Sequence, residues 1–412
     1  MSITTGQMYS ERTSMIALFL APFYIIFNIY LVRWGLKWMG ACHHHFKKKW
    51  VQALVILMDI FFASSLLVAF LLPPSRFQRI MKLIGNYWLG VLLYLALVVI
   101  ITDVVRFILK RVKDFKGKEW LFSRNGFVTI GTICIVIITS LSVWGTINSR
   151  IIHTTDYEVT VDKTVEGMDS LNVVLIADTH LGYNIGTAQM RQMVTKINAV
   201  KPDIVLFAGD MFDNEYEALD DPKELASILS GIESTYGTYA CYGNHDIQEP
   251  ILAGFTFSSK DKKKQSDPRM DQFMEDAGID LLRDEGVLID GSFYVYGRPD
   301  YERPGRGITT RKTAEEITAD LDQTKPIFVI DHEPRELQEL ADAGVDIDFC
   351  GHTHDGQMFP GNLTIKLMWE NACGYLKKDN MHNIVTSGIG VFGPNMRVGT
   401  KSEICNIKVN FK

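Results

Sequence analysis

The sequence predicts two parts of different class: a helical transmembrane region over residues 1–150 and a layered α/β domain over residues 151–412. Three observations support this prediction. Long apolar runs occur in the first part. Short apolar strands alternate with helical stretches in the second part, as in α/β domains. Most of these strands end in polar, glycine-rich tips. A chain of 412 residues also exceeds the size of one typical domain.

Four apolar runs in the first part have the length of a membrane span. Each is close to the roughly 20 residues that a helix needs to cross about 30 Å of hydrocarbon. The runs are Ser14–Val32, Val51–Leu72, Trp88–Leu109 and Phe127–Ile147. The first is not a cleavable signal peptide, because it lacks a small-residue cleavage site and three further spans follow. We therefore expect a multi-pass protein of the cell membrane that contacts membrane lipids.

The charges of the loops predict the orientation. The loops after the first and third runs are rich in Lys and Arg, whereas the loop after the second run holds only Arg76, Arg79 and Lys82. Basic loops stay in the cytoplasm. Both termini, and the α/β domain with them, are therefore expected on the extracytoplasmic side. The net charge of −6 averages two unlike parts, and no nucleic-acid partner is predicted.

Some polar residues of the first part leave alternatives open. Asp59 and Asp103 lie within the runs, where an ionisable residue indicates a functional site by default. A polar contact between helices for Asp59 and a helical charge pair with Arg106 for Asp103 are the favoured explanations. His43–His45 suggest a metal site, but their neighbours Lys47–Lys49 favour a basic patch against anionic headgroups.

The second part has a regular order of short strands and helices. Apolar runs bounded by turn residues predict strands over Asn172–Ala177, Ile204–Ala208, Thr238–Tyr242, Phe293–Tyr296, Ile327–Ile330, Asp346–Cys350, Asn383–Thr386 and Glu403–Val409. Helices are predicted over Thr187–Val200, Pro222–Ser230, Asp271–Ala277, Ala314–Asp322 and Pro334–Ala343.

Five of the strand ends deliver His, Asp or Asn. In chain order the tips are Asp178-Thr179-His180, Gly209-Asp210, Gly243-Asn244-His245-Asp246, His332 and Gly351-His352-Thr353-His354. Functional groups carried on loops that a rigid sheet holds can converge on one point. Residues i and i+2 of an extended segment face the same side, so each Asp-x-His or His-x-His pair can approach one cluster.

These residue types suit divalent metal ions. Carboxylates and imidazoles together bind Mn, Fe or Zn, and one carboxylate can bridge two ions. Two ions about 3.5–4 Å apart can clamp an in-line displacement at phosphorus and lower the pKa of a bridging water. A His beside such a centre can protonate the leaving alkoxide. The tips therefore predict a two-metal phosphoester hydrolase.

The order of the tips resembles the calcineurin-like metallophosphoesterase family over about residues 172–410. The ending Ser387-Gly388-Ile389-Gly390, with Arg397 and Ser402-Glu403-Ile404, is similar to the membrane-associated phosphodiesterase branch of that family, which includes enzymes acting on a UDP-diacylglucosamine lipid. The resemblance implies a four-layer αββα sandwich, that is, two packed mixed sheets flanked by helices, with two divalent metal ions at the strand ends.

The resemblance also implies a role for each tip residue. One metal would be held by Asp178, His180 and His354, the other by Asn244, His332 and His352, and Asp210 would bridge them. His245 would protonate the leaving group, with Asp246 orienting it and Asn244 also touching the phosphate.

Four residues outside the tips have open roles. Asp213 either orients a ligand His or is a solvated loop acid. Arg397 either reaches a phosphate or substrate group or pairs with Glu403 within the fold. Cys373 and Cys405 are candidate disulfide partners if the domain lies outside the cytoplasm.

We expect hydrolysis of a phosphodiester or pyrophosphate bond on a lipid-linked or envelope substrate. The basic loop Lys260–Lys264 and the apolar residues before it (Ile251, Leu252, Phe255, Phe257) suit a headgroup and an acyl chain, but solvated charges and packing under the loop explain them as well. The outward orientation weakens a lipid-nucleotide substrate. One alternative is an anchored phosphomonoesterase or nucleotidase for soluble substrates. The other is a membrane sensor or transporter with a metal-binding domain, which the complete ligand set disfavours.

Overall fold

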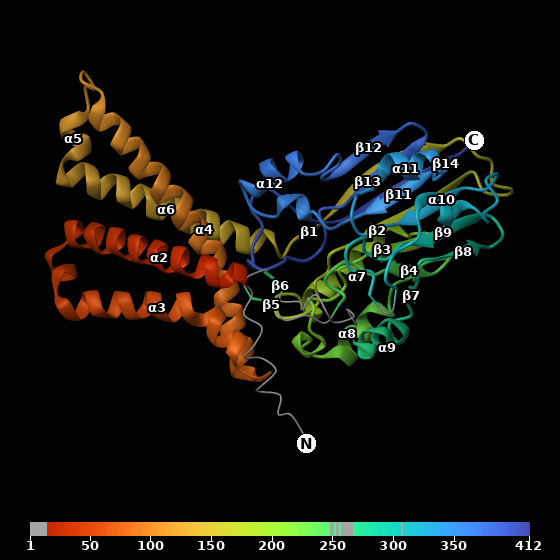
Figure 1. Ribbon diagram of the computed structural model, residues 1–412, viewed down its shortest axis with the longest axis horizontal. Coiled ribbons are helices and arrows are strands. Elements are labelled where there is room, and N and C mark those ends of the chain that lie inside the picture. The colour runs from red at the N-terminus through yellow and green to blue at the C-terminus, as the bar shows by residue number, and fades with distance from the viewer. Residues whose placement is uncertain (1–14, 248–250, 253–254, 257–266, 306–307) are drawn as a thin grey trace. The chain divides into compact units, whose positions relative to one another are not determined.

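The computed structural model describes residues 15–247, 251–252, 255–256, 267–305 and 308–412 of the chain (Figure 1). Its described residues divide into two compact units. The first unit comprises the chain up to Thr146 with short segments from 251–259 and 393–395, and the second unit comprises the rest. The predicted basic loop Lys260–Lys264 and Phe257 lie outside the described residues.

The first unit is helical. Its elements are α2 (Met15–Cys42), η1 (His44–Lys47), α3 (Lys49–Leu71), α4 (Arg76–Arg111), α5 (Lys118–Phe122) and α6 (Arg124–Asn148). Of the helices in the described part, α3, α4 and α6 are long and apolar enough to cross a membrane. Within the described residues the structure thus has three candidate spans and not the four that were predicted. Helix α2 contains all of the first predicted run except Ser14, which lies outside the described residues, and it is not among the three.

Polar contacts between helices account for one acid of this unit. The Tyr30 hydroxyl of α2 donates a hydrogen bond of 2.6 Å to Asp103 of α4. The guanidinium of Arg106 lies instead over the rings of Phe122 and Phe127. The predicted charge pair between Asp103 and Arg106 is thus replaced by a contact between two helices. His43–His45 are exposed in and beside η1, and their ring nitrogens approach within 4.8 Å of one another, so the metal alternative stays open.

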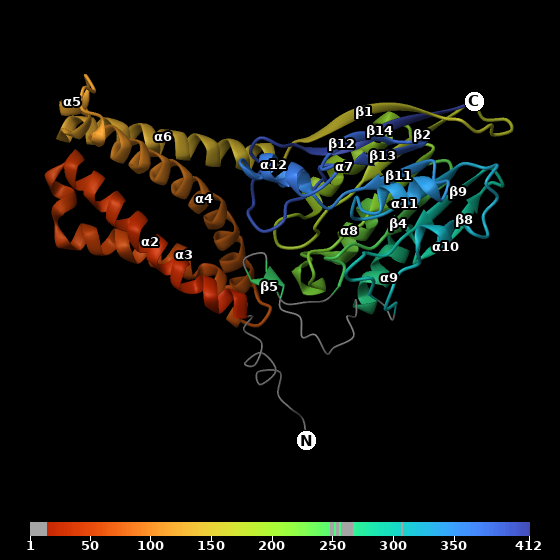
Figure 2. The ribbon, with the colours of Figure 1, turned by 45° about the horizontal axis from the view of Figure 1, so that its top comes forward.

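The second unit contains two six-stranded mixed sheets (Figures 1 and 2). The first sheet has the order β1-β14-β2-β3-β4-β7 and the second the order β12-β13-β11-β10-β9-β8. The strands of the first sheet are β1 (Ile152–Val161), β2 (Ser170–Ile176), β3 (Ile204–Ala208), β4 (Thr238–Cys241), β7 (Asp280–Leu281) and β14 (Ser402–Phe411). Those of the second are β8 (Glu285–Ile289), β9 (Phe293–Gly297), β10 (Ile327–Ile330), β11 (Ile347–Cys350), β12 (Gly374–Lys378) and β13 (Met381–Val385). The short pair β5 (Ile251–Leu252) and β6 (Phe255–Thr256) is counted with the first unit.

The predicted strands and helices of this part are all present, with ends shifted by a few residues. The helices are α7 (Thr187–Val200), α8 (Pro222–Leu229), α9 (Pro268–Asp276), α10 (Ala314–Thr318), α11 (Leu337–Asp342) and α12 (Gly361–Thr364), with the 3-10 turns η2 (Tyr216–Ala218), η3 (His354–Gly356) and η4 (Ile365–Leu367). Strands β1, β7, β8 and β12 were not predicted. Strand β1 runs parallel to β14 and pairs from Ile152 with Ser402 to Val161 with Phe411.

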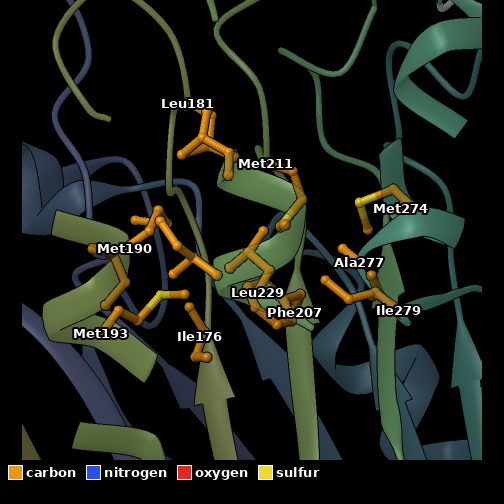
Figure 3. Close-up of a cluster of buried hydrophobic side chains, with 14 of the residues drawn as sticks. Ile176, Leu181, Met190, Met193, Phe207, Met211, Leu229, Met274, Ala277 and Ile279 are labelled. Carbon is orange, nitrogen blue, oxygen red and sulfur yellow. The ribbon is translucent and has the colours of Figure 1, made fainter. Parts of the chain in front are cut away.

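Alternation along the strands builds separate buried clusters. In β3, Val205 and Phe207 face the cluster formed with α7, α8 and α9, part of which Figure 3 shows. Leu206 of the same strand faces the opposite way and joins Phe328 and Phe349 of the second sheet in another cluster. A third cluster joins the second sheet to α10 and α11. Both faces of β3 are covered, which explains its continuous apolar sequence.

Candidate metal centre

Five strands carry the predicted site residues at their carboxyl ends. Asp178 and His180 follow β2, Asp210 follows β3, and Asn244 and His245 follow β4 in the first sheet. These strands are parallel neighbours, so their ends lie side by side. His332 follows β10, and His352 and His354 follow β11, which are parallel neighbours in the second sheet. All seven predicted metal ligands come together where the ends of the two sheets meet.

Asp178, His180 and His354 form the first group. The Nε2 atoms of His180 and His354 face each other at 3.0 Å. Oδ1 of Asp178 lies 3.8 Å from Nε2 of His354. All three side chains are buried, and their ligand atoms lie within 4.8 Å of one another.

Asn244, His332 and His352 form the second group. Nε2 of His332 lies 3.1 Å from Nδ1 of His352. Oδ1 of Asn244 lies 3.0 Å from the former nitrogen and 3.1 Å from the latter. Three ligand atoms are thus within hydrogen-bond distance of one another.

Asp210 lies between the two groups. Its Oδ2 is 3.2 Å from Nε2 of His332 in the second group and 3.7 Å from Nε2 of His180 in the first. Its other oxygen, Oδ1, accepts a hydrogen bond of 2.8 Å from the backbone N–H of His245. The carboxylate is therefore fixed by the backbone on one side and directed toward both groups on the other.

The donor set fits divalent metal ions. Nδ1 of His332 lies 2.9 Å from the backbone oxygen of Ala208, which accepts its proton and leaves Nε2 with a free lone pair. Burial lowers the pKa of His352 to about 3, so its imidazole is neutral, the form that binds a metal. Burial alone would lower the pKa of His332, but the carboxylates of Asp210 and Asp178 raise it well above its usual value, so this position favours a positive charge, which a bound cation would supply.

The backbone of the tips is strained at the predicted ligands. Asp178, His180, Asp210, His352 and His354 have φ of 53°, 43°, 52°, 71° and 51°. Non-glycine residues rarely adopt the left-handed region, and each instance costs of order 1–3 kcal/mol. The surrounding sheets must hold these conformations in place, and such strain concentrates at functional sites.

Two glycines permit the close approach of neighbouring tips. A Cβ atom on Gly351 would lie 2.3 Å from Cβ of Ala177 and 2.8 Å from Oδ2 of Asp178. A Cβ atom on Gly243 would lie 2.3 Å from Oδ1 of Asp210. Any larger residue at either position would displace a predicted ligand, which explains the glycines of these two motifs.

His245 is oriented by a residue that the motifs did not indicate. Its Nδ1 donates to the side-chain oxygen of Asn214, which is completely buried in the loop after β3. Asp246, the predicted orienting group, instead accepts hydrogen bonds from the backbone N–H groups of Phe212 and Gly243. It holds the two loops together and does not bind the ring. Burial lowers the pKa of His245 to about 4.

Two carboxylates lie behind the ligand rings. Oδ1 of Asp213 is 3.7 Å from Nδ1 of His180, which places it behind a predicted ligand, as one of its two predicted roles requires. Oε1 of Glu333 is 3.4 Å from Nε2 of His352. Glu333 was not predicted, and its only signal in the sequence is that it directly follows His332.

Arg397 supports the site from within the fold. It is fully buried, and its guanidinium donates to the backbone oxygens of Ser387 at 2.6 Å and Gly390 at 2.8 Å. The same nitrogen lies 3.3 Å from Nδ1 of His354. Glu403 binds Ser387, Thr155 and Lys401 instead. The described structure has no ion pair between Arg397 and Glu403, and a substrate contact of Arg397 stays a prediction.

The cysteines form no disulfide in the described structure. Cys373 and Cys405, the candidate partners, are both free thiols, and Cys405 is buried in the core between the sheets. Burial raises the pKa of Cys373 to about 12.

Comparison with known proteins agrees with this geometry. Residues 171–356 match the family model described as calcineurin-like phosphoesterase. Residues 171–356 of the chain are therefore similar to this family. The matched segment begins in β2 and ends just after His354, so it contains every predicted metal ligand.

The chain is also similar to metallophosphoesterases of several organisms, one of which is named a transmembrane protein. It is 28% identical over 292 residues to a transmembrane protein with metallophosphoesterase domain from Danio rerio, covering 67% of this chain and 62% of the relative. It is 27% identical to an uncharacterized metallophosphoesterase, Cj0846, of Campylobacter jejuni, covering 68% and 70%. It is 21% identical to the UDP-2,3-diacylglucosamine pyrophosphatase LpxG of Chlamydia trachomatis, covering 55% and 78%. The chain thus spans about three fifths of the length of the zebrafish relative.

Proposed function

We propose that this protein is a membrane-anchored two-metal phosphoesterase that cleaves a phosphodiester or pyrophosphate bond. Residues 1–150 would form the membrane region, and residues 151–412 the catalytic domain, a four-layer αββα sandwich. The observation that carries this proposal is the position of Asp210, whose Oδ2 faces His332 of one ligand group and His180 of the other. A carboxylate between two such groups is the arrangement that a bridged pair of metal ions requires.

Two groups of side chains would each hold one metal ion. Asp178, His180 and His354 would hold one divalent ion, and Asn244, His332 and His352 the other, with Asp210 between them. Mn, Fe and Zn all suit this set of nitrogen and oxygen donors. When bound, the pair of ions would supply a hydroxide near neutral pH and neutralise charge on the phosphoryl oxygens.

His245 would donate a proton to the leaving oxygen. Asn214 occupies its Nδ1, which leaves Nε2 to face the substrate. Burial disfavours the charged ring, but an anionic phosphate beside it would favour protonation. The ring of Phe392 lies against His245 with centroids 4.4 Å apart and would exclude water from one side. Asn244 would also contact a phosphoryl oxygen.

The helices of the membrane region favour a substrate that lies at or near the membrane. Three helices suited to a membrane precede the domain, and the charges of the loops favour an extracytoplasmic position at the cell membrane. A lipid-linked or envelope phosphoester is therefore our proposed substrate. The Chlamydia relative acts on a lipid pyrophosphate according to its name, which supports the same chemistry. Protease treatment of sealed vesicles of known orientation tests the position: digestion from the cytoplasmic face would contradict it.

The reaction is tested with the full chain in detergent. We expect hydrolysis of bis-p-nitrophenyl phosphate with added Mn²⁺, and loss of this activity in Asp210→Asn, which keeps the shape of the side chain but removes its charge. Asp169→Asn, at an exposed position of the same domain, is the matched control and should retain the rate. Hydrolysis of p-nitrophenyl phosphate alone would favour the anchored phosphomonoesterase instead.

A further inference from the structure

The second unit carries an apolar patch on its surface. The patch consists of Phe359, Leu363, Leu367 and Met368, on and around α12 and η4. Their side chains are 46%, 57%, 87% and 75% exposed, respectively. Figure 1 shows that α12 lies outside the strands of both sheets, beside β12. Clustered exposed apolar side chains on one short segment cost solvation free energy, and they mark sites of contact with a partner or a membrane.

Hydrogen bonds connect the patch to residues 397–400, the same stretch of chain that the end of α6 contacts. Asn148, the final residue of α6, donates hydrogen bonds to the backbone oxygens of Arg397 at 3.1 Å and Thr400 at 2.8 Å. The N–H of Phe359 donates to the backbone oxygen of Val398 at 2.8 Å, within the same stretch. The hydroxyl of Thr400 donates in turn to the backbone oxygen of Gln357. The end of α6 and the start of the patch are therefore joined through residues 397–400.

The charges around the patch suit anionic headgroups. Lys366 lies within the segment between Leu363 and Leu367 and is exposed. Lys401, which directly follows the stretch that anchors the patch, pairs with Glu403 at 3.0 Å, so the positive charge of the patch rests on Lys366. The nearby Glu370 is neutralised by an ion pair of 2.7 Å with Lys378. Apolar side chains combined with lysines are typical of segments that lie in a membrane interface.

The patch is continuous with the candidate metal centre. Trp369 follows Met368, and its ring lies edge-on to that of His352 with centroids 5.3 Å apart. The guanidinium of Arg335 lies 4.9 Å from the centre of the same indole ring. A surface that binds at Leu367 and Met368 would therefore lie immediately beside one of the predicted metal ligands.

We propose that the apolar patch inserts into the interfacial layer of the bilayer that holds the chain's own helices. The occupant is the lipid surface, because α6 ends on the stretch that also anchors the patch. Insertion would place the metal centre at the level of the headgroups, where phosphoesters of membrane-embedded molecules lie. This last consequence rests on the proposed function, whereas the insertion itself does not.

Photo-crosslinking of the full chain in lipid nanodiscs tests the insertion. The photoreactive residue p-benzoylphenylalanine is placed at Leu367, at Phe359 as a second patch position, or at Leu288 of β8 as the control, which is also exposed. The nanodiscs contain phosphatidylethanolamine and phosphatidylglycerol. Mass spectrometry should find lipid adducts on the patch peptides at a yield several-fold above that at position 288. Equal yields, no adducts, or crosslinks to a second copy of the chain would overturn the proposal.

A charge introduced into the patch provides the second variant. Met368→Asp in the chain with the photoreactive residue at 367 should reduce the lipid adduct several-fold, because a carboxylate resists entry into the interface. Its rate on soluble bis-p-nitrophenyl phosphate should equal that of the parent chain. An unchanged adduct yield would contradict insertion. If adducts form as expected but the parent chain hydrolyses no phosphoester, the proposed function fails while the insertion stands.

Discussion

Nδ1 of His245 donates a hydrogen bond to the side-chain oxygen of Asn214, and this contact joins the loops after β4 and β3. The N–H of Asn214 also donates to the backbone oxygen of His245 at 3.0 Å. The ring of the proposed acid is thus held in one orientation and one tautomer. Partners of this kind around a metal site typically contribute 10–100-fold to affinity or activity.

Removal of the Asn214 side chain should lower kcat without loss of metal. Asn214 has φ of 62°, so Asn214→Gly removes the amide and keeps a conformation that glycine adopts freely. We expect kcat for bis-p-nitrophenyl phosphate to fall about 10–100-fold with KM and metal content unchanged. Asn198→Gly, at an exposed side chain, is the control for the loss of an amide. Retention of full kcat in Asn214→Gly would show that His245 does not depend on this contact.

The close approach at Gly351 predicts a steric effect on metal binding. In Gly351→Ala the added methyl group would collide with Ala177 and with the carboxylate of Asp178. We expect the variant to lose metal at the group that contains Asp178 and most of its activity with it. Gly186→Ala is the matched control, because a Cβ atom there meets no atom within 4 Å and the backbone is extended. Wild-type metal content and rate in Gly351→Ala would contradict the packing of these tips.

The buried guanidinium of Arg397 predicts a loss of stability on conservative replacement. Arg397→Lys keeps the charge but offers one nitrogen in place of three, so the hydrogen bonds that Nε donates to Gly390 and Nη1 donates to His354 are lost. Lost hydrogen bonds to a charged group cost about 1.5–3 kcal/mol, which lowers Tm by roughly 5–10 °C for a domain of this size. Thermal unfolding followed by circular dichroism measures the change. The control Arg191→Lys, in an exposed pair with Glu224, should leave Tm almost unchanged.

Glu403 predicts a pH dependence of stability away from the metal centre. Burial alone would raise the pKa of its carboxyl, but hydrogen bonds from Thr155, Ser387 and Lys401 lower it below the usual value of 4.5. A pKa that is lowered by folding adds stability above pH 4.5, and this stability is lost as the pH falls through the folded-state value. The Tm difference between wild type and Glu403→Gln should therefore stay constant above about pH 5 and shrink as the pH falls below about 4.5. A constant difference would show that Glu403 has no lowered pKa.

The strands near the site could be predicted from local patterns, whereas the edge strands of the two sheets could not. Strand β3 reads as a strand because both its faces are buried, which makes Ile204–Ala208 uniformly apolar. Strand β1 is half exposed and contains His153, Thr154 and Asp156, so no apolar run marks it. Its partner β14 lies about 250 residues later, and no short-range pattern in a sequence reports such a pairing.

The candidate metal ligands could be located from the sequence because they occupy fixed places after strands. His332 and Asp210 each follow an apolar strand at the point where side chains converge. The residues behind them could not be predicted, because Asn214 and Glu333 act through tertiary contacts and carry no motif of their own. Asp246 shows the limit of assigning roles by adjacency, since its carboxylate binds backbone N–H groups of two loops rather than the neighbouring His245.

Metal analysis of the purified full chain tests the two-metal centre most directly. Protein stripped with a chelator, reloaded with Mn²⁺ and freed of excess ion is analysed for metal per chain by mass spectrometry. We expect two ions per chain in the wild type and at most one in Asp210→Asn, because the bridging carboxylate has lost its charge. Wild-type protein that binds one ion or none, or an Asp210→Asn variant that retains two, would contradict the bridged centre.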